Sequence, residues 1–164
     1  MPPEGGTSGR LTAHVLRRAG GWTGPAFDRA ILTAEERFLR RRVLTLARSG
    51  SLLVDLADPA ALVDGDALET TDGRLVEVVA APEPLAEITA PPEALLRIAW
   101  HVGNRHTPCQ IAPARLLIRR DHVIEAMVAG LGARLVHVVE PFSPEGGAYG
   151  PGRVLGHDHP HDHG

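Results

Sequence analysis

The sequence predicts an α+β protein with three parts: a small N-terminal antiparallel β domain, a ferredoxin-like βαββαβ domain, and a disordered histidine-rich tail. Three observations support this. Short aliphatic and β-branched runs separated by turn residues fill the first half of the chain. In the second half, apolar residues recur twice at helical spacing between further β-like runs. In the last nine residues histidine occupies alternate positions between glycine, aspartate and proline, and nothing apolar is available to bury.

The β domain is expected over residues 11–81. Residues 43–46, 52–56 and 75–79 are apolar runs of strand length, and turn signals such as Asp72-Gly73 separate them. Asp-Gly between apolar runs is typical of a hairpin, because glycine adopts positive φ without a Cβ clash. Thr33 and Glu36 have the spacing of a capping box, which indicates at most a short helix. Residues 1–10 are small and polar and are predicted to be disordered.

A linker is predicted at residues 81–84, because two prolines in three positions favour extended chain. The second domain is then expected over residues 84–142. Prolines 91 and 92 can begin a helix and Gly103-Asn104 can close it; Asp121 can cap a second helix that Gly132 ends. The apolar positions of the two helices repeat at i, i+3, i+4 and i+7: Leu95, Ile98, Ala99 and Val102, then Ile124, Met127, Val128 and Leu131.

The strands of this second domain are expected at residues 85–89, 110–111, 116–118 and 135–139. The resulting order, β-α-β-β-α-β, is that of the split βαβ unit, in which two helices cover one face of a four-stranded sheet. From residue 143 to residue 164 glycine, proline and histidine dominate, so a flexible tail is predicted there.

The tail has the composition of a metal-binding segment. Its four imidazoles belong to His157, His159, His161 and His163. Neutral imidazole is the commonest protein ligand for nickel, zinc and copper, and the alternating aspartates add oxygen donors. An expression tag or a merely soluble tail would be the alternative, but purification tags are usually uninterrupted histidine, whereas Asp and Pro interrupt this run.

Composition excludes several functions. The formal net charge of −3 over 164 residues argues against a nucleic-acid partner held by bulk electrostatics. The single cysteine excludes an intramolecular disulfide and a cysteine-rich metal cage, which agrees with a reducing cytoplasm. The N-terminal segment lacks the features of a secretory signal, and no apolar run approaches the ~20 residues that span a bilayer. A cytoplasmic protein without a membrane partner is therefore expected.

The most specific internal segment covers residues 100–111 and reads Trp-His-Val-Gly-Asn-Arg-His-Thr-Pro-Cys-Gln-Ile. It resembles the signature of the urease accessory protein E family of nickel metallochaperones, in which His-(aliphatic)-Gly-Asn-Arg-His precedes a strand that opens with Gln-Ile. The resemblance extends over about residues 33–149, through Asp-His-Val at 121–123, Gly-Leu-Gly-Ala at 130–133, Pro-Phe at 141–142 and Gly-Gly-Ala-Tyr-Gly at 146–150. It is strong after residue 84 and looser before it.

The resemblance implies a homodimer that meets through its C-terminal domains and is not an enzyme. The family's main metal ligand maps onto His106, which with its twofold mate would bind one Ni(II) across the interface. The tail histidines would then supply exchangeable donors. The β domain would dock partner proteins, and nickel would pass to a urease accessory GTPase and the urease apoprotein complex.

Some members carry a His-Asp-His pair at the second helix; here it reads Arg120-Asp121-His122, which weakens a secondary site but leaves His122 as a candidate ligand. For the remaining residues structural roles are expected. His101 is expected at the helix or interface and Cys109 as a small hydrophobe, with metal ligation as the alternative for both. His137 is expected in a strand, Asn104 in left-handed backbone after the helix, and Arg105 in a contact that ties the turn or the dimer. No role is assigned to His14.

The function predicted is delivery of nickel for assembly of the urease active site, with Zn(II) or Cu(II) as further ions the ligands could hold in vitro. A nickel or zinc storage protein without specific delivery needs the tail but not His106. A metalloenzyme using His106 and His122 is a third alternative, although the sequence shows no nucleophile with a base and no phosphate loop.

Overall fold

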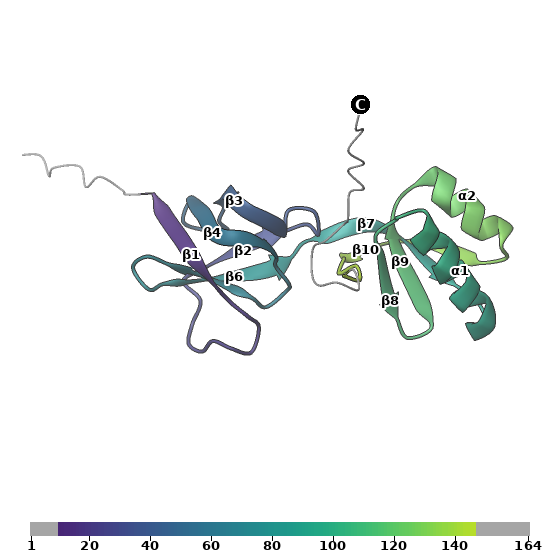
Figure 1. Cartoon of the computed structure of the whole chain (residues 1–164), viewed down its shortest axis with the longest axis horizontal. Coiled ribbons are helices and arrows are strands. Elements are labelled where there is room, and N and C mark those ends of the chain that lie inside the picture. Colours follow the sequence, from purple (N-terminus) through teal and green to yellow (C-terminus); the bar gives the residue numbers. More distant parts are fainter. Residues whose placement is uncertain (1–9, 147–164) are drawn as a thin grey trace, which may run out of the picture.

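A computed structural model describes residues 10–146, which form two sheets and two helices arranged along one long axis (Figure 1). The first sheet holds β1 (Leu11–Arg17), β2 (Asp28–Leu32), β3 (Phe38–Thr45), β4 (Ser51–Ala61), β5 (Ala67–Thr70) and β6 (Leu75–Ala80). The second unit holds β7 (Pro82–Thr89), α1 (Pro92–Asn104), β8 (Cys109–Ala112), β9 (Arg115–Arg119), α2 (His122–Gly130) and β10 (Arg134–Pro141).

The α+β prediction is confirmed. The sequence predicts disorder at residues 1–10 and 143–164; of these, residues 1–9 and 147–164, including the four tail histidines, lie outside the described residues.

The sheet of the β domain is mixed rather than wholly antiparallel. Its strand order is β2-β6-β5-β1-β4-β3, and the pairs β1/β4 and β2/β6 are parallel. Turn residues in the sequence indicate only which consecutive strands form hairpins. They do not indicate that two strands far apart in the sequence pair with each other, so the parallel pairs were not predicted. Aliphatic side chains from all six strands, including Leu52, Val54 and Val76, are buried between the strands as one core.

The predicted capping box forms, but around a turn instead of a helix. Thr33 N–H donates to the Glu36 carboxylate at 2.8 Å, and Glu36 N–H donates to the Thr33 hydroxyl at 3.3 Å. The next residues enter β3 at Phe38, so the cap closes a tight connection between β2 and β3.

The second unit has the ferredoxin-like arrangement that the sequence predicts. Its strand order is β10-β7-β9-β8 and each neighbouring pair is antiparallel. Both helices pack on one face, where Ile98 and Val102 of α1 and Ile124 and Val128 of α2 meet sheet residues such as Ile118. Figure 1 shows the helices together on that side of the sheet. Neither is long and apolar enough to cross a membrane.

Local sequence explains where the helices begin. Pro91 precedes α1, and Pro92 occupies its first turn, where a missing N–H leaves no hydrogen bond unmade. Asp121 caps α2 by accepting from Val123 N–H at 2.9 Å and Ile124 N–H at 3.1 Å.

The predicted linker at residues 81–84 is nearly absent. Strand β7 already begins at Pro82, so only Ala81 separates it from β6. Pro82 opens the strand, and Pro84 precedes Leu85, the first residue of β7 that pairs with β9, so both prolines lie where β7 has a neighbour on one side only. The two domains are therefore joined by almost continuous strand.

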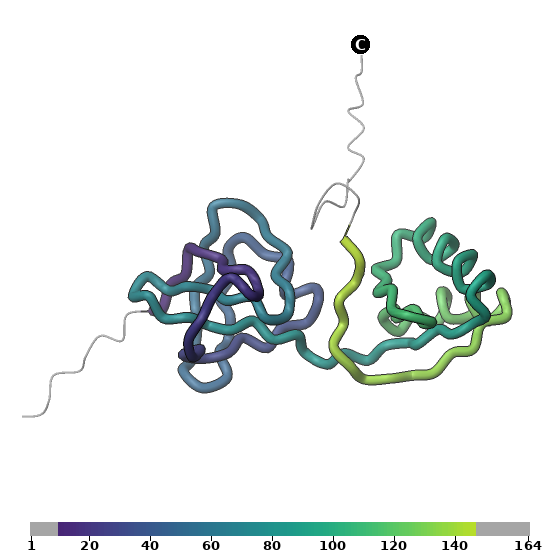
Figure 2. Tube along the Cα trace, turned by 90° about the horizontal axis from the view of Figure 1, so that it is seen from below, coloured from purple at the N-terminus to yellow at the C-terminus, as the bar shows by residue number. Residues whose placement is uncertain are grey.

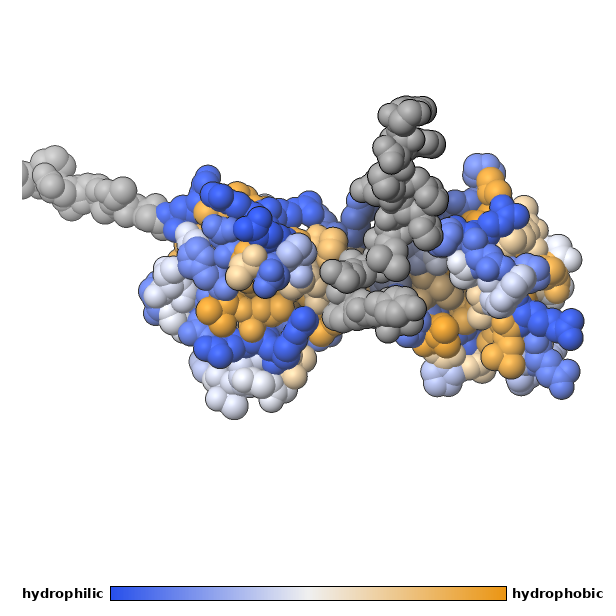
Figure 3. Space-filling model, in the orientation of Figure 1, coloured by the Kyte–Doolittle hydropathy of each residue, from blue (hydrophilic) through white to orange (hydrophobic). Residues whose placement is uncertain are grey.

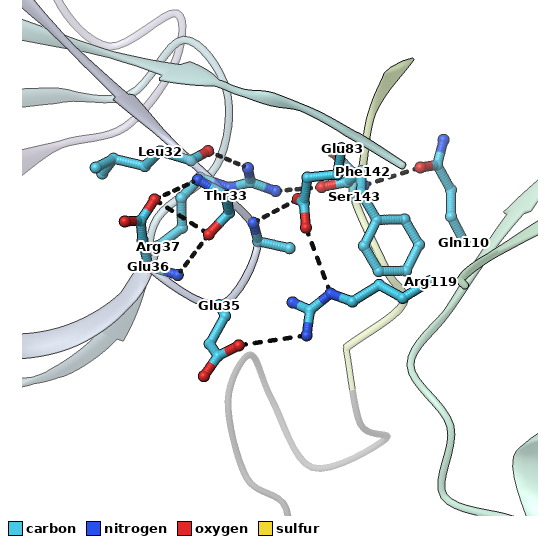
Figure 4. Close-up of polar contacts among 11 residues, drawn as sticks. Leu32, Thr33, Glu35, Glu36, Arg37, Glu83, Gln110, Arg119, Phe142 and Ser143 are labelled. Carbon is cyan, nitrogen blue, oxygen red and sulfur yellow. Dashed lines mark hydrogen bonds and ion pairs between the residues drawn. The ribbon is translucent and has the colours of Figure 1, made fainter. Parts of the chain in front are cut away.

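Buried charges fix the junction between the domains (Figure 4). Arg37 is only 4% exposed, and its guanidinium donates to the carbonyls of Leu32 and, across the junction, Phe142. Glu83 of β7 accepts from Ala34 N–H at 2.8 Å, and its second oxygen lies 3.4 Å from Arg119 Nε. Burial lowers the pKa of Arg37, whereas the Glu83 and Asp64 carboxylates raise it. These contacts satisfy charges that would otherwise be costly to bury.

Candidate metal centre

His106 stands directly beyond the C-terminal end of α1. Three consecutive amides wrap this end: Arg105 N–H donates to the Val102 carbonyl at 3.1 Å, His106 N–H to Gly103 at 3.0 Å, and Thr107 N–H to Val102 at 3.4 Å. The chain then enters β8 at Cys109. The turn thus presents His106 at a fixed place between a helix and a strand.

The backbone of His106 is left-handed, with φ of 53°. Glycine usually takes this position after a helix, since any Cβ raises the energy there. The expectation that Asn104 would adopt this conformation is wrong, because Asn104 is still the last residue of α1. A solvent-exposed histidine in this backbone conformation makes His106 a candidate for a functional role.

The His106 ring makes no hydrogen bond to residues 10–146, so among these its nitrogens are available to a ligand. The neighbouring His101 differs: it is half-buried on α1, and its ring meets Trp100 edge to face, with centroids 5.0 Å apart. This contact fits the structural role expected of His101.

His122 is the exposed first residue of α2. Two residues earlier, Arg120 pairs with Glu125 at 2.8 Å, and the other Glu125 oxygen lies 2.9 Å from His137 Nε2. Burial raises the pKa of Glu125, but hydrogen bonds from Arg120 and His137 outweigh it and hold the pKa below its usual value. Glu125 is therefore an ionised carboxylate that already accepts from Arg120, His137 and the Asp121 amide.

Cys109 is half-buried and packs with the apolar core beneath the helices. Burial, together with the nearby Glu145 carboxylate, raises the pKa of its thiol to about 11. The protonated thiol is a poor metal ligand, which supports the role of small hydrophobe expected from the sequence.

Within residues 10–146 no group of three or more His, Cys, Asp or Glu side chains is placed to hold a metal ion. His106 and His122 are thus brought to the surface separately, each with an incomplete shell. A metal bound at His106 would therefore need further donors from outside this group, such as a second copy of the chain, residues outside 10–146 or water.

The chain matches two protein-family descriptions that together cover nearly all of it. Residues 10–81 match the N-terminal domain, and residues 83–164 the C-terminal domain, of the UreE urease accessory protein. The chain belongs to the UreE family.

Individual relatives within the UreE family agree. The urease accessory protein UreE of Cereibacter sphaeroides is 56% identical over 90% of this chain and 79% of its own length. Those of Ruegeria pomeroyi and Rhodobacter capsulatus are each 55% identical, over 88% and 86% of this chain and 95% and 88% of theirs. The family resemblance drawn from residues 100–111 is therefore confirmed.

The structure adds residues around the UreE signature that sequence reasoning missed. Glu145 N–H donates to the Cys109 carbonyl at 2.8 Å, and Ser143 N–H donates to the Gln110 side chain at 2.8 Å. The start of the segment predicted as flexible tail is thus bonded to β8, three residues from His106. No sequence signal marks these contacts, because backbone donors belong to every residue type except proline.

Proposed function

We propose that this protein is a nickel metallochaperone for urease maturation, which binds Ni(II) through His106 at a homodimer interface and through the tail histidines. As a UreE protein it acts as an accessory factor, not as an enzyme. The observation that supports this most directly concerns His106. Its backbone is left-handed, its side chain is exposed, and neither ring nitrogen has a hydrogen-bond partner in residues 10–146. Nickel is the cargo, so an incomplete shell suits exchange with a recipient's ligands.

The apolar surface beside His106 supports a dimer. Leu96 is 74% exposed and Trp100 is 64% exposed, one turn apart on the same side of α1. Ile111 on the edge strand β8 is also largely exposed. Figure 3 shows hydrophobic surface on this domain. Burial of such side chains against a twofold mate would bring the two copies of His106 towards each other, because His106 lies two residues beyond the end of α1 at Asn104.

The tail histidines and His122 complete the proposal. His157, His159, His161 and His163 supply mobile donors, and His122 offers a further single imidazole. In this scheme the β domain docks the urease accessory GTPase and the urease apoprotein complex in the cytoplasm, and neither nucleic acid nor membrane takes part. Zn(II) and Cu(II) would also bind in vitro, since Cu(II) exceeds Ni(II) in affinity for most nitrogen sites.

A storage protein is the second candidate, and the tail composition favours it. Storage requires capacity, which four imidazoles in seven residues provide, and it makes no use of a fixed ligand at a helix end. The two functions therefore differ in whether a site survives without the tail.

Nickel titration by calorimetry, on the full chain and on a chain truncated after Tyr149, separates them. We expect truncation to lower the number of ions bound but to leave a site of about half an ion per protomer, because His106 remains. Size-exclusion mass measured in parallel should show the dimer in both cases. Loss of all nickel binding with the tail would favour storage and contradict delivery through His106.

A further inference from the structure

We propose that residues 142–145 form a strap that positions the root of the histidine tail beside His106; this inference rests on the proposed function and names the residues that serve it. Strand β10 ends at one edge of the four-stranded sheet, whereas β8, which follows the His106 turn, lies at the opposite edge. A tail that left the domain where β10 ends would start about three strand spacings, roughly 14 Å, from β8. The strap carries the chain across that distance.

Phe142 anchors the strap on the sheet face opposite the helices. Its side chain is fully buried against Leu85 of β7 and Leu117 of β9, with Ala34 of the β domain packed on the same cluster. Its carbonyl accepts from the buried Arg37 guanidinium, and Arg119 lies over its ring at 5.8 Å. Both domains therefore hold this point of the chain, and Figure 2 shows the segment turning back between them.

Two hydrogen bonds then lead the chain from the anchor to β8. Ser143 N–H donates to Gln110 Oε1, as Figure 4 shows, and Glu145 N–H donates to the Cys109 carbonyl. The first of these hydrogen bonds is to Gln110 and the second is to Cys109, which is one residue closer to His106 in the sequence. Gly146, the last described residue, therefore continues from the His106 end of β8.

The point where the tail leaves the domain affects metal binding at His106, because the tail histidines and His106 belong to the same molecule. Ten residues lie between Gly146 and His157, so the two are eleven residue steps apart, a span of at most about 40 Å when extended and roughly 18 Å on average for a flexible chain. At this scale a shift of the root by one or two strand spacings changes the effective concentration of tail imidazoles at His106. The strap keeps that concentration high without becoming a ligand itself.

The test uses backbone substitutions that leave all metal ligands in place. Glu145→Pro removes the N–H that bonds Cys109, and combining it with Gln110→Met also removes the acceptor for Ser143. Glu145→Ala is the matched control, since it removes the carboxylate but keeps the N–H. Pro144 already restricts the backbone at this point, so a second proline should be accommodated without disturbing Phe142.

The first readout is made without metal. A nitroxide on a cysteine replacing Gly150, in a Cys109→Ala background of the full chain, should broaden the NMR amide signals of Thr107 and Gln110 more than those of Val136 and His137. The ratio of the broadening at Thr107 and Gln110 to the broadening at Val136 and His137 should fall at least twofold in the double variant Glu145→Pro with Gln110→Met. It should not fall in Glu145→Ala. Equal broadening on both sides of the sheet, or equal ratios in all variants, would overturn the strap.

The second readout is nickel affinity at the site that survives tail truncation. The full chain should bind nickel at this site more tightly than the chain truncated after Tyr149. Glu145→Pro with Gln110→Met should reduce that difference in affinity by about twofold or more, and it should leave the affinity of the truncated chain unchanged. An unchanged tail contribution would contradict positioning by the strap. If no nickel binds at His106 at all, the proposed function fails, while the metal-free measurement still decides where the tail begins.

Discussion

Replacing Phe142 by alanine should lower the free energy of unfolding of the C-terminal domain by about 3–5 kcal/mol, the usual cost of removing a fully buried aromatic side chain. Phe142 is fully buried and closes the sheet face that the helices leave open, against Leu85 and Leu117. Its loss would open a cavity there and expose the Arg37 guanidinium contact to water. Urea unfolding measures the change.

Phe38→Ala is the matched control, because Phe38 lies half-exposed on β3 and its truncation should cost less than about 1 kcal/mol. The two tryptophans allow each domain to be followed separately, since Trp22 lies in the β domain and Trp100 on α1. We expect their unfolding transitions to coincide in the unmodified chain and to separate in Phe142→Ala. Coinciding transitions of unchanged midpoint in Phe142→Ala would show that this residue does not hold the junction.

Replacing His106 by asparagine should abolish the nickel site that survives tail truncation, lowering affinity there by at least 100-fold, because removal of one imidazole from each protomer takes two ligands from a shared ion. Asparagine is chosen because it tolerates the left-handed backbone found at this position, so the turn after α1 should keep its shape. Calorimetry on the chain truncated after Tyr149 measures the effect.

His14→Asn provides the control for loss of a histidine that is not a ligand. His14 lies on β1, where its Nδ1 contacts the Asp55 carbonyl at 2.8 Å, far along the chain from the proposed site. Nickel binding should be unchanged in this variant. Undiminished binding in His106→Asn, with the dimer intact, would remove His106 from the account.

The sequence predicted the ferredoxin-like domain well because its signals are local. Four apolar positions per helix, a proline start and an aspartate cap each act within a few residues, and the order of elements then leaves few sheet topologies. The β domain was predicted only as a class. Its parallel pairs join strands such as β1 and β4, which lie about 40 residues apart, and no short-range pattern encodes such a pairing.

The candidate site shows the same division. The segment at residues 100–111 revealed His106, because a short signature carries the resemblance. Arg37 belongs to a stretch rich in charge, and Glu83 belongs to the proline-containing segment predicted as a linker. Both stretches resemble solvated surface, so only the three-dimensional packing shows that these side chains are buried. The contacts of residues 142–145 were missed for a further reason: the Phe142 and Glu145 backbone groups and the Ser143 N–H bond to residues far away in the sequence, and no short-range pattern marks such contacts.

Native mass spectrometry of the nickel-loaded chain truncated after Tyr149 would test the shared site most directly. We expect a dimer that carries one nickel ion, and a dimer without nickel when His106 is replaced by asparagine. A monomer that retains one ion, or a dimer with two independent ions that persist in His106→Asn, would contradict a site built from the same histidine of two protomers.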